Sequence, residues 1–398
     1  MIMTFTFIIN NTTERSGIRE EGFFVARATE PREVPRSDSP RCGYTAVVIF
    51  WLVACTVQRG EYPESWTIRF RPQLGGNIVS EPQRFEVPEG VESFNLVCGD
   101  DDDVHQYSLF SLSGPNGVIA GYSRLIPDNP HYLLLVPGPL LVEQFPQAPN
   151  EPVEPGIFTF RVQVEPEEAE TECSVVWGSR EANRVNLGIY VGSGTGMTAE
   201  DAGADPAVLG VIEEAFDAYS RFGLELGDVT WSDLPTDSYS EPLAATAVVG
   251  EGARLCRGLD VEPGAIAVVL VDDIQGDPGP DSFSAGGVSP APGAAGRPGT
   301  SESCIAIALS APDPAHSLAH ELGHFLGLLH PVEWNGEGGD PLDDTPMCTL
   351  DADTDGNGAL SSAECGVDGD LMWWVNDTDS EALTADQLWV LQRSPGLR

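Results

Sequence analysis

Apolar and polar residues alternate along the first half of the chain with the period of two that half-buried strands require. Residues 66–71 and 158–164 show this alternation, and proline and glycine punctuate the intervals between such runs. The pattern predicts an all-β sandwich domain over residues 56–165. The stretch that follows, residues 166–184, begins with a cluster of glutamates and is interpreted as an acidic linker.

From residue 185 the pattern changes to longer apolar runs and helical spacing. Val185–Val191 and Ala265–Val271 are rich in apolar residues and predict strands. Between them, Asp205 followed by Pro206 predicts the start of a helix, and Gly223 predicts its end. We therefore predict an α/β domain over residues 185–398.

A long loop, a strand and a helix follow in that order. Residues 276–300 are rich in Gly, Pro and Ser and predict the loop, a type of segment that is often functional. Cys304–Leu309 is the predicted strand, and Asp313 with Pro314 caps the predicted helix. Near the C-terminus, residues 384–387 form a capping box for a further helix that we expect only to pack.

The helix after Pro314 carries the candidate chemistry. On it His320 and His324 lie one turn apart on one face, where two imidazole nitrogens can meet one Zn²⁺ ion. Glu321 points away from that row but can reach a water molecule on the metal's open position, so it is the candidate general base. Gly327 suits a left-handed turn that brings His330 back as the third ligand.

Other interpretations of these histidines are disfavoured. A helix with ordinary surface histidines would not need a glycine and a third histidine at these offsets. His316 lies one turn before His320, but the ligand set is already complete, so we interpret it as a neighbour of the site or as exposed. A purely structural zinc is disfavoured because three histidines leave an open position, whereas structural sites are usually closed by cysteines.

The pattern HExxHxxGxxH at residues 320–330 resembles the zinc motif of the metzincin metallopeptidases. The resemblance implies a metzincin-like catalytic domain, with a mixed sheet and a zinc helix, that acts on a protein or peptide. It also implies that an extended substrate pairs with an edge strand, for which Cys304–Leu309 is the candidate.

The segment after the zinc motif resembles the pappalysin branch of the metzincins. Residues 330–333 (HPVE) and 339–346 (GDPLDDTP) carry that resemblance. Met372 is similar to the methionine of the Met-turn, which lies beneath the metal in this superfamily. Relatives often place a tyrosine two residues later to hold the oxyanion, but this chain has Trp374, whose indole offers only an N–H donor.

Residues 353–364 fit the twelve-residue calcium loop of an EF-hand in register, with Gly358 at the sixth position. The alternative is an acidic turn that binds no metal. The candidate Ca²⁺ ligands are Asp353, Asp355, Asn357, Ala359 through its carbonyl, Ser361 and Glu364. Asp340, Asp343 and Asp344 are candidate ligands for a second Ca²⁺ ion near the cleft.

An apolar run at Tyr44–Ala54 follows Arg41. It is too short to span a bilayer but suits a secretory signal, so residues 1–55 are interpreted as a leader and signal segment. The ending Leu-Val-Ala-Cys resembles a bacterial lipobox, which implies lipidation of Cys55. We expect a lipoprotein of the bacterial cell envelope, or otherwise a secreted protein. An ordinary cleaved signal and a buried strand are the alternatives for this run.

Six cysteines follow Cys55, and an even number in an exported chain favours disulfides. Pairing of neighbours along the chain is the simplest arrangement among many. The predicted disulfides are Cys98–Cys173, Cys256–Cys304 and Cys348–Cys365.

The formal net charge of this 398-residue chain is −42, and all 20 basic residues are arginine. Nucleic acid and anionic membrane surfaces repel such a chain, so we expect no nucleic-acid partner and no membrane contact beyond a lipid anchor. An acidic surface also suits Ca²⁺ binding. We expect a monomer.

Together these features predict an exported zinc endopeptidase with Glu321 as the general base. The rival hypothesis is a calcium-dependent surface binding or adhesion protein with a degenerate peptidase domain. Trp374 favours the rival, whereas the presence of Glu321 favours the enzyme.

Overall fold

The computed structural model describes most of the chain from residue 65 onward. The described residues are 65–70, 79–100, 104–121, 138–165, 171–179, 181–235, 243–245, 254–275, 284–336, 338–367, 369–375 and 382–398. They all lie in one compact unit that includes Gln58–Arg398. The predicted leader and signal segment, with Cys55, lies outside the described residues.

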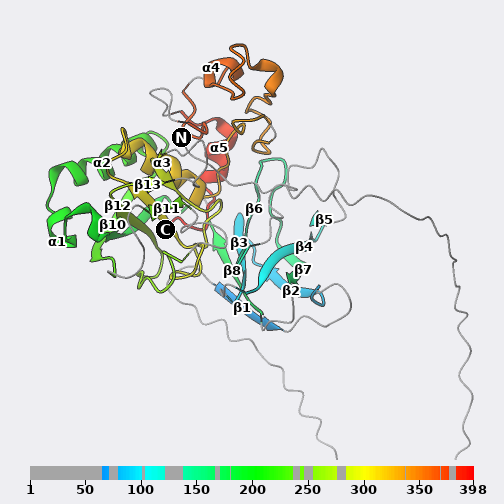
Figure 1. Cartoon of the computed structure of the whole chain (residues 1–398). Helices are drawn as coiled ribbons and strands as arrows, with labels where there is room; N and C mark the ends of the chain where they lie inside the picture. Colours follow the sequence, from blue (N-terminus) through cyan, green and yellow to red (C-terminus); the bar gives the residue numbers. More distant parts are fainter. Residues whose placement is uncertain are drawn as a thin grey trace, which may run out of the picture. The chain divides into compact units, whose positions relative to one another are not determined.

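Two four-stranded antiparallel sheets form the first half of this unit (Figure 1). Their strand orders are β1-β8-β3-β6 and β2-β7-β4-β5. The strands are β1 (Ser65–Phe70), β2 (Gln83–Val87), β3 (Ser93–Gly99), β4 (Gln106–Gly114), β5 (Gly117–Gly121), β6 (Leu141–Phe145), β7 (Gly156–Glu165) and β8 (Thr171–Gly178).

The two sheets share one hydrophobic core. Phe94 of β3 meets Phe158 of β7 edge to face, with ring centroids 5.3 Å apart. Along β7 the alternating residues from Phe158 to Val164 are buried and those between them are partly exposed, as the period of two predicted. That this half is an independent domain stays a prediction.

Strand β8 corrects the interpretation of residues 166–184 as a linker. It lies between β1 and β3 in the first sheet, so residues 171–178 are structural core. Val175 and Val176 are fully buried, and Cys173 is bonded to Cys98 of β3. The glutamates just before β8 dominated the local pattern and hid this short apolar strand. The beginning of the linker, residues 166–170, lies outside the described residues.

A five-stranded mixed sheet with the order β10-β9-β12-β16-β15 forms the second half. Its strands are parallel except for β15, which runs antiparallel to β16. A small sheet of two-residue strands, β11-β13-β14, is also present. The bounds are β9 (Arg184–Val191), β10 (Glu225–Asp233), β11 (Leu243–Ala244), β12 (Ala265–Val271), β13 (Ile274–Gln275), β14 (Ser284–Ala285), β15 (Gly287–Val288) and β16 (Cys304–Ala308).

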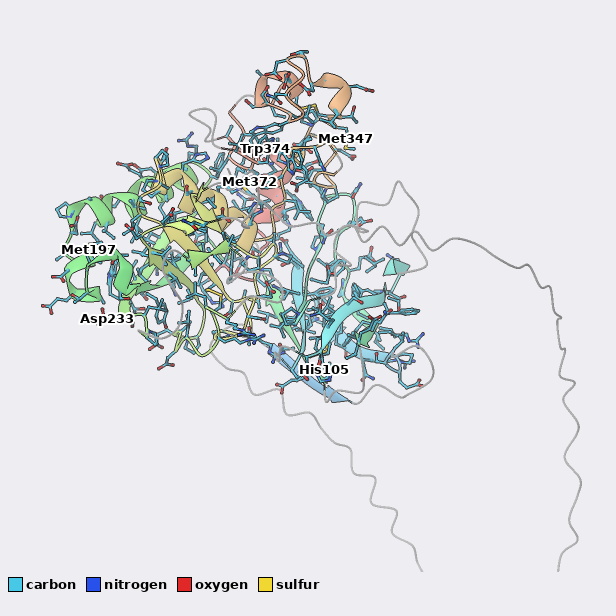
Figure 2. The ribbon with its side chains drawn as sticks, in the orientation of Figure 1. His105, Met197, Asp233, Met347, Met372 and Trp374 are labelled. Atoms are coloured by element: carbon cyan, nitrogen blue, oxygen red, sulfur yellow. A yellow bond between two sulfur atoms is a disulfide. The ribbon has the colours of Figure 1, made fainter. Side chains whose placement is uncertain are left out.

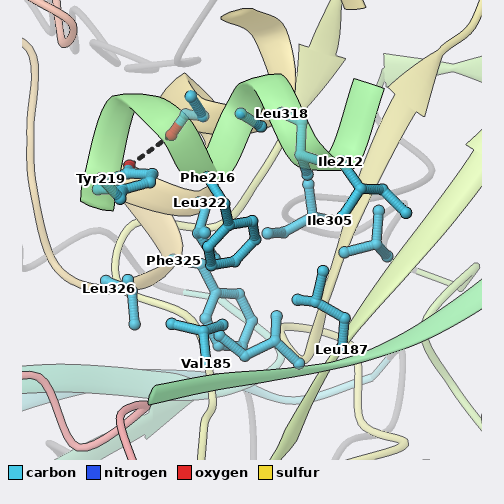
Figure 3. Packing of buried hydrophobic residues seen from close by; sticks show 14 of the residues in the cluster. Val185, Leu187, Ile212, Phe216, Tyr219, Ile305, Leu318, Leu322, Phe325 and Leu326 are labelled. Atoms are coloured by element: carbon cyan, nitrogen blue, oxygen red, sulfur yellow. Dashed lines mark hydrogen bonds between the residues drawn. The ribbon is translucent and has the colours of Figure 1, made fainter. Parts of the chain in front are cut away.

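Helices α2 (Pro206–Ser220) and α3 (Pro314–Phe325) pack with this sheet in one apolar core (Figure 3). Asp205 caps α2 as predicted, because its carboxylate accepts hydrogen bonds from two backbone N–H groups of the first turn. The Tyr219 hydroxyl of α2 donates to the Ala319 carbonyl of α3 at 2.5 Å, and Figure 3 shows this bond above the apolar contacts. The backing helix thus fixes α3 with a buried polar contact as well as with apolar surface.

The edge of the mixed sheet differs from the expectation. Cys304–Leu309 was the candidate edge strand, but β16 is paired on both sides, with β12 and with β15. The edge is β15, and it arises inside the stretch 276–300 that the sequence predicted to be loop only. Its two residues, Gly287 and Val288, are too few to give a strand pattern in the sequence.

The C-terminal region contains short elements. They are η6 (Leu350–Ala352), α4 (Ser362–Cys365) and α5 (Ala385–Leu391). Two other short elements, η3 (Ser193–Thr195) and α1 (Ala199–Ala202), lie before α2. The predicted capping box begins α5, with Thr384 and Gln387 exchanging hydrogen bonds between side chain and backbone. Val390 and Leu391 of α5 are buried in the same core as α2 and α3.

Three disulfides join neighbouring cysteines in the predicted pairing, Cys98–Cys173, Cys256–Cys304 and Cys348–Cys365. The second ties the segment around residue 256 to β16, directly before the zinc-motif helix. Among the described residues, no helix has the length and apolar character that a membrane crossing requires.

We predict that Tyr219→Phe lowers the free energy of unfolding by about 1 kcal/mol, because it removes one buried hydrogen bond and little volume. Amide hydrogen exchange in α3 should speed up at the same time. The matched control is Tyr190→Phe, which removes a bond of 2.6 Å to the Asp260 carbonyl in a different core cluster. The control should lose similar stability without faster exchange in α3. Unchanged exchange in Tyr219→Phe would contradict the role assigned to this bond.

Candidate metal centre

The motif helix α3 begins at a cap and is buried along nearly its whole length. The Asp313 carboxylate accepts a hydrogen bond from the His316 backbone N–H at 2.9 Å, and Pro314 occupies the first turn. Every residue from Ser317 to Phe325 is buried. The ring centroid of His316 lies 6.4 Å from that of His320. His316 is not part of the group formed by His320, His324 and His330.

His320, His324 and His330 converge at the C-terminal part of α3. The Nε2 atom of His330 lies 3.2 Å from that of His320 and 3.0 Å from that of His324. All three rings are buried, and their ligand atoms lie within 4.8 Å of one another. The structure therefore brings together the three predicted ligands, one of them ten residues away from the first.

Each of the three rings has a partner for its other nitrogen. Nδ1 of His320 is 2.8 Å from the Leu371 carbonyl, and Nδ1 of His324 is 2.8 Å from the Leu328 carbonyl. A carbonyl only accepts, so in both rings Nδ1 carries the proton and Nε2 keeps its lone pair. Three converging lone pairs repel one another unless a cation lies among them, and nitrogen donors in this number suit Zn²⁺.

The third ring is oriented by a carboxylate. Nδ1 of His330 lies 3.2 Å from Oε1 of Glu333, whose side chain is partly exposed. Metal-binding histidines usually donate their second N–H to such a carboxylate or to a carbonyl, which raises the basicity of the ligand. The role of Glu333 could not be assigned from the sequence pattern alone. The only hint in the sequence was that Glu333 lies three residues after the candidate ligand His330.

Burial keeps the imidazoles of His320 and His324 neutral. Desolvation, followed by the neighbouring histidines, lowers the pKa of His320 well below its ordinary value and that of His324 to about 3. A neutral imidazole is the form that binds a metal, so these two rings are ready to act as ligands at any physiological pH.

Glu321 is buried beside the histidines, and its Oε1 atom has no hydrogen-bond partner. Burial raises the pKa of this carboxyl well above its ordinary value. The edge strand lies against it, since a Cβ atom at Gly287 would be 2.5 Å from Cγ of Glu321. Only glycine allows β15 to come so close to the candidate base, a requirement that sequence analysis missed.

Met372, the candidate methionine of the turn, packs against α3. It is fully buried, and a Cβ atom at Gly323 of α3 would lie 2.5 Å from its sulfur. Asp370 holds the turn by accepting a hydrogen bond from the Met372 N–H at 2.7 Å. Because the next residue back, Leu371, supplies the carbonyl for His320, this turn supports both the helix and a ligand.

Trp374 has a packing role in the structure (Figure 2). Its Nε1–H donates to the Leu360 carbonyl at 2.9 Å, and only 8% of its surface is exposed. It belongs to a small cluster with Leu360, Trp373 and the Cys348–Cys365 disulfide. The indole N–H is therefore engaged outside the histidine group.

The EF-hand-like loop brings Asp353, Asp355 and Glu364 together, with ligand oxygens within 4.8 Å of one another. Each carboxylate already accepts hydrogen bonds within the loop, such as those from Gly356 N and Gly358 N to Asp353. Hydrogen bonds from Ser361 and then Thr354 lower the pKa of Glu364 to about 2.

Asp340, Asp343 and Asp344 do not form a comparable group of ligand oxygens among the described residues. Oδ1 of Asp340 accepts from the Leu342 N–H and from the Thr345 hydroxyl, while Oδ2 of Asp344 caps α5 by accepting from Asp386 N. Burial raises the pKa of Asp340 to about 7.

Comparison with known proteins was consistent with this geometry. The family model described as pregnancy-associated plasma protein-A, Peptidase_M43, matches residues 305–387, which contain β16, α3 and the methionine turn. The match is consistent with a metzincin-type zinc metallopeptidase in this segment. The recognition drawn from the zinc motif and the residues after it is thus confirmed for the metallopeptidase segment.

Other comparisons are more distant. The crystal structure of metalloproteinase-II from Bacteroides fragilis is similar at 17% identity and a TM-score of 0.26. The alignment covers 37% of this chain and 44% of that chain, so this chain spans less than half the length of that metalloproteinase. No curated protein matches the chain.

We predict that Trp374→Phe destabilises the small cluster by about 1–3 kcal/mol, because the buried Leu360 carbonyl loses its donor. Urea unfolding measures this loss, and zinc content per chain should stay the same. Trp334→Phe is the control, since Trp334 is 39% exposed and should change stability little. A loss of zinc at full stability would show that the indole acts at the metal instead.

Proposed function

We propose that the chain is an exported zinc-dependent endopeptidase, with zinc held by His320, His324 and His330 and with Glu321 as general base. The observation that carries this proposal is the convergence of three buried Nε2 atoms whose opposite nitrogens are each held by an acceptor. The match of residues 305–387 to a peptidase family supports the same activity and implies a protein or peptide substrate.

His320, His324 and His330 would hold the zinc ion, which would supply Lewis acidity toward the scissile carbonyl and toward water near neutral pH. The Glu321 carboxylate takes the proton from the attacking water and delivers it to the leaving amine nitrogen. Its burial excludes competing solvent, and its unpartnered Oε1 is free to receive that proton. The rings of His320 and His324 stay neutral and fixed by their carbonyl partners throughout.

The substrate is proposed to bind as an extended strand along β15. This strand is the edge of the mixed sheet and lies against Glu321 through Gly287. Strand addition there uses main-chain hydrogen bonds, which do not depend on the substrate's side chains. Cys304–Leu309 is an inner strand, paired on both sides, so its main chain is not available for strand addition.

Export is proposed from the cysteine usage together with the apolar run near the N-terminus. All six cysteines after Cys55 form disulfides, which persist in oxidising compartments. Lipidation of Cys55 in a bacterial envelope is the proposed form of attachment, and an ordinary secreted form is the alternative. We propose a monomer.

Calcium at residues 353–364 is proposed as a structural cofactor. The support is the match to the EF-hand ligand positions and the convergence of three carboxylates at the loop. Among the described residues no second carboxylate group supports a site at Asp340, Asp343 and Asp344.

We predict that Glu321→Gln keeps zinc but lowers peptide cleavage by about 10²–10⁴-fold, because an amide cannot accept the proton. Metal analysis and turnover of a mixed peptide library by the full chain measure the two effects. The double variant His320→Ala with His324→Ala is the control and should lose both zinc and activity. Equal cleavage by wild type and Glu321→Gln would contradict the assigned base, and no cleavage by wild type would favour the binding protein.

We predict that Ca²⁺ raises the melting temperature of the wild type and that Glu364→Gln abolishes this shift, since the bidentate ligand is lost. Differential scanning fluorimetry in a Ca²⁺ titration measures it. Asp351→Asn is the control, because Asp351 lies just before the loop, is exposed and occupies no ligand position. The same shift in Glu364→Gln as in wild type would exclude calcium from this loop.

A further inference from the structure

Two buried amide side chains on the first sheet are directed at the zinc-motif helix. Asn95 of β3 and Gln144 of β6 are register partners in the antiparallel pair, with exposures of 1% and 2%. Their neighbours Phe94 and Phe145 face the core between the two sheets, so the amides lie on the opposite face. Buried amides are costly unless they are hydrogen-bonded, and here the partners belong to the other half of the molecule.

Gln144 holds the end of α3. Its Nε2 donates to the Leu326 carbonyl at 3.1 Å, directly after the last residue of the helix, and its Oε1 accepts from the Ser394 hydroxyl at 3.4 Å. The Leu326 carbonyl lies in the last turn, where backbone acceptors lack partners within the helix. Gln144 therefore supplies a donor that α3 itself cannot provide.

The same amide packs on the glycine of the zinc motif. Gly327 has φ +104°, and a Cβ atom there would lie 2.6 Å from Cδ of Gln144. Glycine is thus required at this position for two reasons, the left-handed backbone and the space that Gln144 occupies. Sequence analysis identified only the first of these reasons.

The turn that Gln144 holds sets the ligands. Gly327 N donates to the His324 carbonyl at 2.9 Å, and Leu328 N donates to the Gly323 carbonyl at 2.9 Å. The Leu328 carbonyl in turn accepts from Nδ1 of His324. A displacement of Leu326 or Gly327 would therefore rotate the His324 ring and move the start of the segment that leads to His330.

Asn95 holds the same region through a second path. Its Nδ2 donates to the Gly293 carbonyl at 2.8 Å, and Gly293 N donates to the Phe325 carbonyl at 3.0 Å. A Cβ atom at Gly293 would lie 2.5 Å from Cγ of Phe325, so this loop contacts the last residue of α3 closely. The two opposite residues of this strand pair are thus linked to consecutive positions at the end of the helix, Gln144 directly to Leu326 and Asn95 through Gly293 to Phe325.

We propose that Gln144 and Asn95 are positioning residues for the zinc site and that the first sheet is part of the catalytic architecture. The proposal rests on the three-histidine site proposed above. Outer partners of metal ligands typically contribute 10–100-fold to metal affinity, and Gln144 acts one step further out, through the Leu328 carbonyl. We expect its loss to weaken zinc binding by about 10-fold and to change the coordination geometry.

Gln144→Met in the full chain tests the proposal, because methionine keeps the length of the side chain and removes both hydrogen bonds. The readouts are Zn²⁺ affinity by chelator competition and the visible absorption spectrum of the Co²⁺-substituted protein, which depends on ligand geometry. We expect weaker Zn²⁺ binding and an altered Co²⁺ spectrum. The matched control is Val162→Ala on β7, a fully buried residue of the core between the two sheets. It should lower the melting temperature and leave both metal readouts unchanged.

The outcomes separate this proposal from the proposed function. A wild-type affinity and spectrum in Gln144→Met would overturn the positioning role. Equal changes in Val162→Ala would also overturn it, because they would reflect overall stability alone. If Gln144→Met does not fold, Asn95→Ser replaces it; its Zn²⁺ affinity and Co²⁺ spectrum are then measured and judged by the same criteria. A Co²⁺ spectrum that survives His320→Ala with His324→Ala would overturn the three-histidine site itself, whatever Gln144 does.

Discussion

The burial of one polar helix constrains the rest of the structure. From Ser317 to Phe325 helix α3 is buried, although it carries two histidines and a glutamate. Buried polar groups are tolerated only when they have partners, so the surroundings must supply acceptors at fixed positions. The Leu371 and Leu328 carbonyls do this for the two histidines. Glu321 Oε1 has no hydrogen-bond partner, and this is the atom that the proposed reaction uses.

Local features could be predicted from the sequence because their causes lie within a few residues. The caps at Asp205, Asp313 and Thr384 are present where the residue types indicated them. The zinc ligands also follow from local geometry, since two lie one helical turn apart and a glycine turn returns the third. The disulfides have the simplest pairing, although the sequence alone allowed others. These predictions needed no knowledge of how distant segments meet.

What could not be predicted depends on contacts between distant segments. The sequence pattern predicts a linker at β8 because the neighbouring glutamates outweigh a short apolar run, whereas its position between β1 and β3 fixes it as a strand. Strand β15 has two residues and acquires its edge role only by pairing with β16. Gln144 lies 182 residues from the carbonyl to which it donates. An amide in an apolar strand signals that a partner exists but not where it lies.

The turn at residues 370–374 shows how an irregular segment is made rigid enough to support a ligand. Asp370 accepts from the Met372 N–H and from the Gln387 side chain of α5, which fixes the turn from one side. On the other side Trp374 donates to Leu360 in a cluster of few buried residues. A core that small contributes little stability by itself. The Cys348–Cys365 disulfide compensates because it covalently links two segments of the cluster. The Leu371 carbonyl of this turn orients His320, whereas the indole of Trp374 packs outside the histidine group. Stabilisation of the oxyanion is therefore assigned to groups other than residue 374.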